Sequence, residues 1–147
     1  MDGRTQLALV ARVQHARTIA REAGGLLMTH FGRIESYDQK RSPVDLVSEA
    51  DRQSDTFLSR RVAERFPGDV LISEEHDGDA GADAKAEALG TAEFAFVIDP
   101  LDGTTSFVHG YPFFAVSIGI THRGRAAAGV VYAPYFDELY VGGDTVP

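Results

Sequence analysis

A short stretch of acids, glycine and threonine in the second half of the chain has the composition of a site for metal and phosphate. It reads Asp99-Pro100-Leu101-Asp102-Gly103-Thr104-Thr105 and directly follows the apolar run Phe94–Ile98. A buried strand that ends in two carboxylates needs compensation, because unpaired charge at the edge of a core is costly. Across a bend stiffened by proline the two acids can approach one point. Such hard oxygen ligands suit Mg²⁺.

The residues around these two acids extend the same chemistry. Gly103 permits a backbone conformation that other residues avoid, so the amides after it could open a helix toward an anion. Glu74, at the end of another apolar strand, could supply a further ligand, and Asp51 on a helix could converge on the same point. Taken alone, Asp51 would be interpreted as a helix-capping acid and Glu74 as a solvated strand end.

Two amphipathic helices are predicted to support this site. Apolar residues recur at spacings of three and four over Thr5–His30, although Gly24-Gly25 weakens that prediction locally. A second helix is predicted over Ser48–Phe66, with its first residue as N-cap and Asp51 in its first turn. Ser42-Pro43 is expected to be a break before this helix, since proline biases the preceding residue away from helix.

The remaining elements are predicted to be short strands that form a mostly antiparallel sheet. The predicted strands are Val70–Ile72, Phe94–Ile98, Ala115–Thr121, Ala127–Tyr132 and Glu138–Val141. The segment His76–Glu93 is rich in Gly, Ala and Asp, and we expect an exposed loop that could contain a helical turn around Ala84–Leu89. A helix pair followed by such a sheet predicts the α+β class, with the pair packed on the sheet.

Length and composition bound the kind of protein. The chain has 147 residues, which suits one domain, and 44% hydrophobic with 24% charged residues is ordinary for a globular protein. A net charge of -8 argues against a large nucleic-acid footprint, and the lack of cysteine excludes disulfides and zinc–thiolate sites. No signal-peptide pattern or long apolar run is present, so the default expectation is a soluble cytoplasmic protein with no membrane contact.

Several sequence blocks, taken together and in order, resemble the inositol monophosphatase family. The blocks are Ser42–Asp51, Ile72–Glu75, Phe96–Pro112 and Ala115–Gly119. The resemblance implies the N-terminal part of a layered α/β sandwich, with residues 1–147 as a domain that matches the first half or so of a family member. A later Trp-Asp block, which would supply one more metal-ligating Asp and part of the alcohol-binding surface, is not among the 147 residues.

The resemblance also implies roles for particular residues. The implied metal ligands are Glu74, Asp99, the backbone carbonyl of Leu101, and Asp102. The implied phosphate-binding residues are Gly103, Thr104 and Thr105. Water activation falls to Thr104 with Glu74 or Asp51, and which of these two acids takes the proton is left open. The implied cofactor is Mg²⁺, as two or three ions, with Mn²⁺ as a substitute. The reaction would be direct attack of metal-activated water on a phosphate ester.

The implied substrate is a small phosphorylated polyol, with inositol monophosphate the leading candidate, and the full-length family form is expected to be a homodimer. One alternative is a catalytically incomplete metal-binding or phosphate-binding fragment, or a partner-binding pseudoenzyme. Another is a related phosphatase for nucleotide 3′-phosphates, fructose bisphosphate or histidinol phosphate. Ser106 departs from the family pattern, which usually has Asn there. The 147-residue chain is further expected to be a poor catalyst and to expose a sheet face or edge through which it self-associates.

Overall fold

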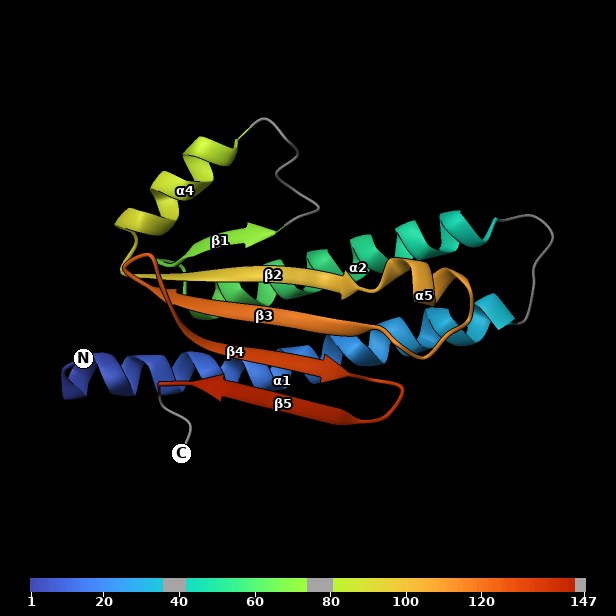
Figure 1. Ribbon diagram of the computed structural model, residues 1–147, viewed down its shortest axis with the longest axis horizontal. Helices are drawn as coiled ribbons and strands as arrows, with labels where there is room; N and C mark the ends of the chain where they lie inside the picture. Colours follow the sequence, from blue (N-terminus) through green and yellow to red (C-terminus); the bar gives the residue numbers. More distant parts are fainter. Residues whose placement is uncertain (36–41, 74–80, 145–147) are drawn as a thin grey trace.

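A single sheet of five strands, with two long helices on one face, forms the framework of the computed structural model (Figure 1). The structure describes residues 1–35, 42–73 and 81–144. Its elements are α1 (Gly3–Glu35), α2 (Pro43–Arg65), β1 (Val70–Ser73), α4 (Ala82–Thr91), β2 (Phe94–Asp102), α5 (Thr104–Val108), β3 (Ala115–His122), β4 (Arg125–Ala133) and β5 (Glu138–Gly143). The strand order is β1-β2-β3-β4-β5, with β1 parallel to β2 and the other pairs antiparallel. The predicted α+β class, a helix pair on a mostly antiparallel sheet, is confirmed.

The core lies between the helix pair and one face of the sheet. Alternate residues along β3 are buried because successive side chains of a strand point to opposite faces, and β2 is buried over most of its length. The buried strand residues include Phe94, Phe96, Ile98, Val116, Ile118 and Ile120, and they pack in one cluster with Leu9, Val13, Ala16, Ala20 and Leu27 of α1. The helical periodicity read from the sequence therefore marks the face of α1 that contacts the sheet.

The helix α1 passes through Gly24-Gly25 without a break, and the packing explains the first of these glycines. A Cβ atom placed on Gly24 would lie 2.5 Å from the ring of Tyr132 on β4. The missing side chain therefore lets α1 approach the sheet closely at this point. Gly25 has no atom within 4 Å of such a Cβ, so its packing imposes no comparable requirement.

The helix α2 begins earlier than the sequence suggested. Ser42 is its N-cap and accepts a hydrogen bond from the Asp45 amide at 3.1 Å, while Pro43 occupies the first turn. Proline is favoured at the first helical position because its missing N–H would have no partner there. The prediction that Ser48 caps this helix is therefore wrong. Asp51 does not lie in the first turn but well inside the helix, where its side chain is buried.

Two further boundaries differ from the predictions. Part of the segment expected to be a loop forms the helix α4, whose residues are all at least partly exposed, as an insert with little to bury would be. The strand β2 does not end at Ile98 but continues through an irregular register to Asp102. This continuation makes both acids of the motif part of the sheet.

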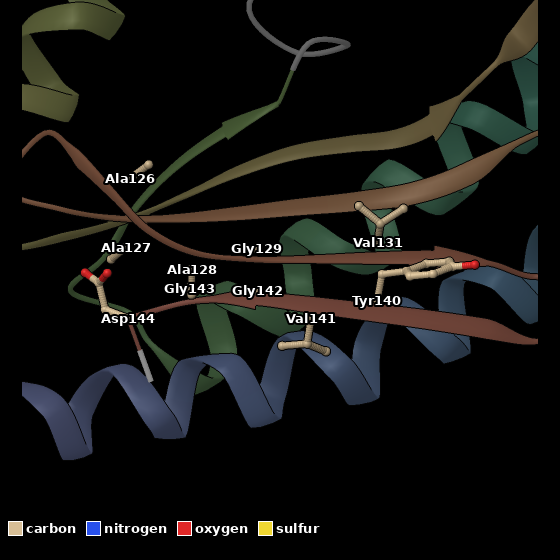
Figure 2. A pocket seen from close by; sticks show the side chains of 10 residues that line it. All are labelled: Ala126, Ala127, Ala128, Gly129, Val131, Tyr140, Val141, Gly142, Gly143 and Asp144. Carbon is tan, nitrogen blue, oxygen red and sulfur yellow. The ribbon is translucent and has the colours of Figure 1, made fainter. Parts of the chain in front are cut away.

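The face of the sheet away from the helices is open in the part of the chain that the structure describes. Its register aligns Val97, Gly119, Gly129 and Gly142 in one row across four strands. The neighbouring row pairs Val131 with Tyr140, both exposed and drawn in Figure 2, where a groove of about 590 Å³ follows β4 and β5. The expectation of an exposed sheet face agrees with this arrangement.

Candidate metal and phosphate site

A bulge in β2 brings the two acids of the motif to one face of the sheet. Asp99 lies opposite Ser117 and Asp102 lies opposite Ala115, so β2 has one more residue than β3 between these pairs. In a regular strand, residues three apart point to opposite faces. The extra residue of the bulge reverses this, because the two β3 partners are two apart and share a face. The sequence could not show this register, but the proximity expected from the Pro-containing bend is consistent with it.

The bend between the two acids is held from both sides. The Leu101 amide donates a hydrogen bond to Asp99 Oδ1 at 3.3 Å. The Ser54 hydroxyl on α2 donates to the Pro100 carbonyl at 2.8 Å. Pro100 and Leu101 are both buried, while Asp102 is exposed. The bend is therefore anchored to α2, and its second acid faces solvent.

Gly103 ends the bend in a conformation that glycine adopts far more easily than other residues. Its φ is 87°, and a Cβ placed there would lie 2.6 Å from the backbone oxygen of Phe113. The short helix α5 begins at the next residue, Thr104, as the sequence predicted. Phe107 of α5 is fully buried against Phe31 and Phe114, with ring centroids 5.5 and 4.7 Å away. The amides at the start of α5 are thus fixed relative to the sheet.

Asp51 lies on the same cavity as the threonine pair. The cavity has a volume of about 370 Å³ and is lined by Val44, Val47, Ser48, Asp51, Thr104, Thr105 and Val108. Asp51 is only 7% exposed, whereas both threonines are exposed. Figure 1 shows the corresponding arrangement of α5 beside the N-terminal half of α2. The predicted combination of Asp51 with Thr104 is therefore placed around one concave surface.

The end of β1 is also bound to α2. Ser73, the last residue of β1, donates a hydrogen bond to Asp55 Oδ1, and both side chains are buried. Ser73 lies opposite Ile98 in the parallel register, directly before Asp99 on β2. Glu74, the predicted ligand and alternative base, lies outside the described residues, and its two roles stay predictions. Within residues 1–35, 42–73 and 81–144, no group of three His, Cys, Asp or Glu side chains could hold a metal.

Three polar residues of this region carried no prediction: Ser54 and Asp55 on α2, and Ser73 on β1. A signal for the first two was present in the sequence. They follow Asp51 by three and four residues and precede the buried Leu58, so they fall on the same helical face as the core residues. Polar side chains on an apolar helical face need hydrogen-bond partners. The sequence prediction for this face of α2 used only its apolar residues and therefore missed Ser54 and Asp55.

The residues of the bend fit Mg²⁺ by the chemistry of their donor atoms. Asp99 and Asp102 offer carboxylate oxygens and Leu101 a backbone carbonyl, with no competing nitrogen or sulfur donor among the predicted ligands. The hydrogen bond that Asp99 accepts from the Leu101 amide still allows Asp99 to bind metal, because an ionised carboxylate has about four lone-pair directions. The set of donors is that of a hard divalent cation.

Comparison with known proteins identifies the family. The model of the inositol monophosphatase family matches residues 9–145. The chain is 40% identical over 125 residues to inositol monophosphatase 3 of Solanum lycopersicum, across 85% of this chain and 44% of that protein. It is 33% identical over 127 residues to a protein of Thermotoga maritima named fructose-1,6-bisphosphatase/inositol-1-monophosphatase, across 86% of this chain and 45% of that protein.

A solved structure shows the same relation. The extragenic suppressor protein SuhB of Bartonella henselae superposes with a TM-score of 0.71 at 33% identity, covering 90% of this chain and 48% of that one. The chain thus spans about half the length of the relatives it matches. Because the family model covers nearly all of its residues, the chain belongs to the inositol monophosphatase family.

Proposed function

We propose that this chain forms the metal-binding and phosphate-binding half of a Mg²⁺-dependent phosphatase of small phosphate monoesters, with inositol monophosphate as the leading substrate. The observation that carries the proposal is the bend Asp99–Thr105, in which two acids share a face of the sheet and a helix opens directly after them. Family membership supports the same reaction, since the relatives are named as inositol monophosphatases.

Each residue of the site has a proposed task. Asp99, Asp102 and the Leu101 carbonyl, with Glu74, hold the metal, either as Mg²⁺ or with Mn²⁺ in its place. The backbone amides of Gly103, Thr104 and Thr105 bind the phosphate oxygens, as free amides at a helix start can. Bound metal supplies Lewis-acid stabilisation of the phosphate charge and lowers the pKa of water. The Thr104 hydroxyl orients the attacking water, and Asp51 or Glu74 takes its proton.

The burial of Asp51 supports its candidacy as this proton acceptor. The Asp51 side chain is only 7% exposed, so its carboxyl is held at the cavity wall and shielded from bulk water. Asp51 lines the cavity that also contains Thr104, so both groups can face one bound water. We assign Asp51 and Glu74 as the two candidates for the proton.

The location and oligomeric state are proposed from the charge of the chain and from its family. A chain with a net charge of -8 is suited neither to nucleic acid nor to an anionic membrane surface, and we propose a cytoplasmic location. No helix in the described part of the chain is long and apolar enough to cross a bilayer. For the full-length form we propose a homodimer.

Two alternatives have specific support. The chain spans 44% of the length of its tomato relative, so one alternative is a fragment that binds metal and phosphate without turnover. The name of the Thermotoga relative includes fructose-1,6-bisphosphatase, so fructose bisphosphate is the second substrate candidate. Nucleotide 3′-phosphates and histidinol phosphate remain further candidates of the same class.

Phosphate release separates these proposals. The purified chain would be incubated with inositol monophosphate or fructose bisphosphate, with Mg²⁺ or with a chelator. We expect slow, Mg²⁺-dependent release, below the roughly 1–10³ s⁻¹ of typical enzymes, and none from Asp99→Asn. Release that persists in chelator or in Asp99→Asn would contradict the proposed reaction. Metal binding without any release would identify the fragment alternative.

A further inference from the structure

We propose that Ser54 is a positioning residue for the metal site: its hydroxyl fixes the peptide unit between Pro100 and Leu101 and thereby orients the Asp99 carboxylate. This inference rests on the proposed function, because it assumes that Asp99 binds metal. It assigns a task to a side chain that no part of the proposed reaction uses. Ser54 contributes neither a ligand nor a group that would touch the substrate.

One peptide unit of the bend takes part in two hydrogen bonds. The Pro100 carbonyl accepts a hydrogen bond from Ser54 Oγ at 2.8 Å. The amide at the other end of that same unit, on Leu101, donates to Asp99 Oδ1 at 3.3 Å. A peptide unit is planar and rigid, so its carbonyl and amide turn together. Releasing the carbonyl from Ser54 therefore also releases the amide that orients the carboxylate.

The bond from Ser54 is built into the interior rather than added at the surface. Ser54 is 0% exposed, and Pro100 is buried. A serine inside a helix commonly donates to the carbonyl one turn earlier in its own helix. The Ser54 hydroxyl instead reaches across to β2, so the bond links two elements far apart in sequence. Without it, the buried Pro100 carbonyl would lack this donor, and the bend would be expected to move to recover one.

A neighbouring hydroxyl on the same helix supplies a matched control. Ser59 also makes a side-chain hydrogen bond, donating to Asp55 Oδ1 at 3.5 Å, but it has no bond to the bend. Ser59→Ala removes the same atoms from the same helix as Ser54→Ala. A general loosening of α2 would weaken metal binding in both variants, whereas an effect through the Pro100–Leu101 peptide would weaken it only in Ser54→Ala.

The experiment is a calorimetric titration of Mn²⁺ into the whole 147-residue chain and its variants, each first checked for folding by circular dichroism. Removing an outer partner of a metal ligand typically lowers affinity about 10–100-fold, and we expect at least about tenfold weaker binding in Ser54→Ala. Ser59→Ala should bind within about twofold of the unsubstituted chain, since its bond does not reach a ligand. Asp99→Asn should bind no metal at this site.

The outcomes distinguish this inference from the function on which it rests. Equal affinity in Ser54→Ala and the unsubstituted chain, with binding lost in Asp99→Asn, would overturn the role of Ser54 alone. Unchanged binding in Asp99→Asn, or no binding by the unsubstituted chain, would overturn both. If Ser54→Ala does not fold, the Mn²⁺ titration is repeated with Ser54→Cys, whose side chain has nearly the same size as serine but is only a weak hydrogen-bond donor. Failure of both variants to fold would make Ser54 structural and also overturn the inference.

Discussion

Replacing Gly103 with alanine should destabilise the protein more than the same change at Gly110, although both residues have positive φ. Gly103 has φ 87° and Gly110 has φ 74°. A left-handed conformation costs a residue with a Cβ about 1–2 kcal/mol. Alanine also restricts the unfolded chain, which offsets about 0.4–1 kcal/mol of that cost. A net loss of about 1 kcal/mol is therefore expected from conformation alone.

The difference between the two sites comes from space. A Cβ on Gly110 would meet nothing within 4 Å, whereas one on Gly103 would lie 2.6 Å from the Phe113 oxygen and 3.2 Å from the Phe114 Cα. Both of these are backbone atoms, so relief requires a shift of the chain. Overpacking of this kind costs about 1–3 kcal/mol. Gly103→Ala should therefore lose about 2–4 kcal/mol and Gly110→Ala about 1 kcal/mol.

Thermal unfolding followed by circular dichroism measures this difference. At about 3–4 °C per kcal/mol for a chain of this size, Gly103→Ala should melt roughly 6–16 °C below the unsubstituted chain and Gly110→Ala about 3–4 °C below it. The shift forced on the bend should also weaken phosphate binding in the first variant. Equal melting temperatures for the two variants would refute the reasoning, because the close approach of Gly103 to the backbone of Phe113 and Phe114 would then impose no constraint.

Three further predictions concern packing, protonation and association. Gly24→Ala should lower the melting temperature because its Cβ would meet the Tyr132 ring. Gly25→Ala should raise the melting temperature, because alanine in a helix is about 1 kcal/mol more stable than glycine. Equal shifts for the two variants would contradict this packing. Burial is the main cause that lowers the pKa of His15, followed by the opposing hydrogen bond to the Arg61 carbonyl. The unfolded chain then takes up the proton first, so this stability contribution is complete above about pH 6.5 and is lost as the pH falls through the folded pKa. His15→Gln should flatten the dependence of melting temperature on pH between 7.5 and 5, and an unchanged slope would exclude His15 as its source. Light scattering should show self-association of the 147-residue chain through its open sheet face, and a monodisperse monomer would contradict that expectation.

The motif around the two acids was readable from the sequence because its parts are local. A proline bend, a glycine that tolerates positive φ and a helix start are all encoded within Asp99–Thr105. The strands were likewise predicted from short apolar segments bounded by turn residues. Local chemistry and local periodicity therefore sufficed for the existence of the main elements and for the order in which they occur.

Three features could not be predicted from the sequence: one depends on a local hydrogen bond, and two depend on partners distant in sequence. The sequence Ser42-Pro43 is compatible both with a break before a helix and with an N-cap followed by proline at the first helical position. The hydrogen bond from the Asp45 amide to Ser42 identifies the second arrangement. The bulge in β2 depends on its pairing with β3, which no single strand encodes. The task of Ser54 depends on its reach to Pro100. For the bulge and for Ser54 the missing information was tertiary.

The most direct test of the proposed metal site is a calorimetric titration of Mg²⁺ into the chain, Asp99→Asn and Asp83→Asn. Asp83 is an exposed acid in the first turn of α4, so its loss removes the same charge away from the bend. The proposed site predicts saturable binding by the unsubstituted chain and by Asp83→Asn, and no binding by Asp99→Asn. Equal affinity in all three proteins would show that the bend Asp99–Thr105 is not the metal site.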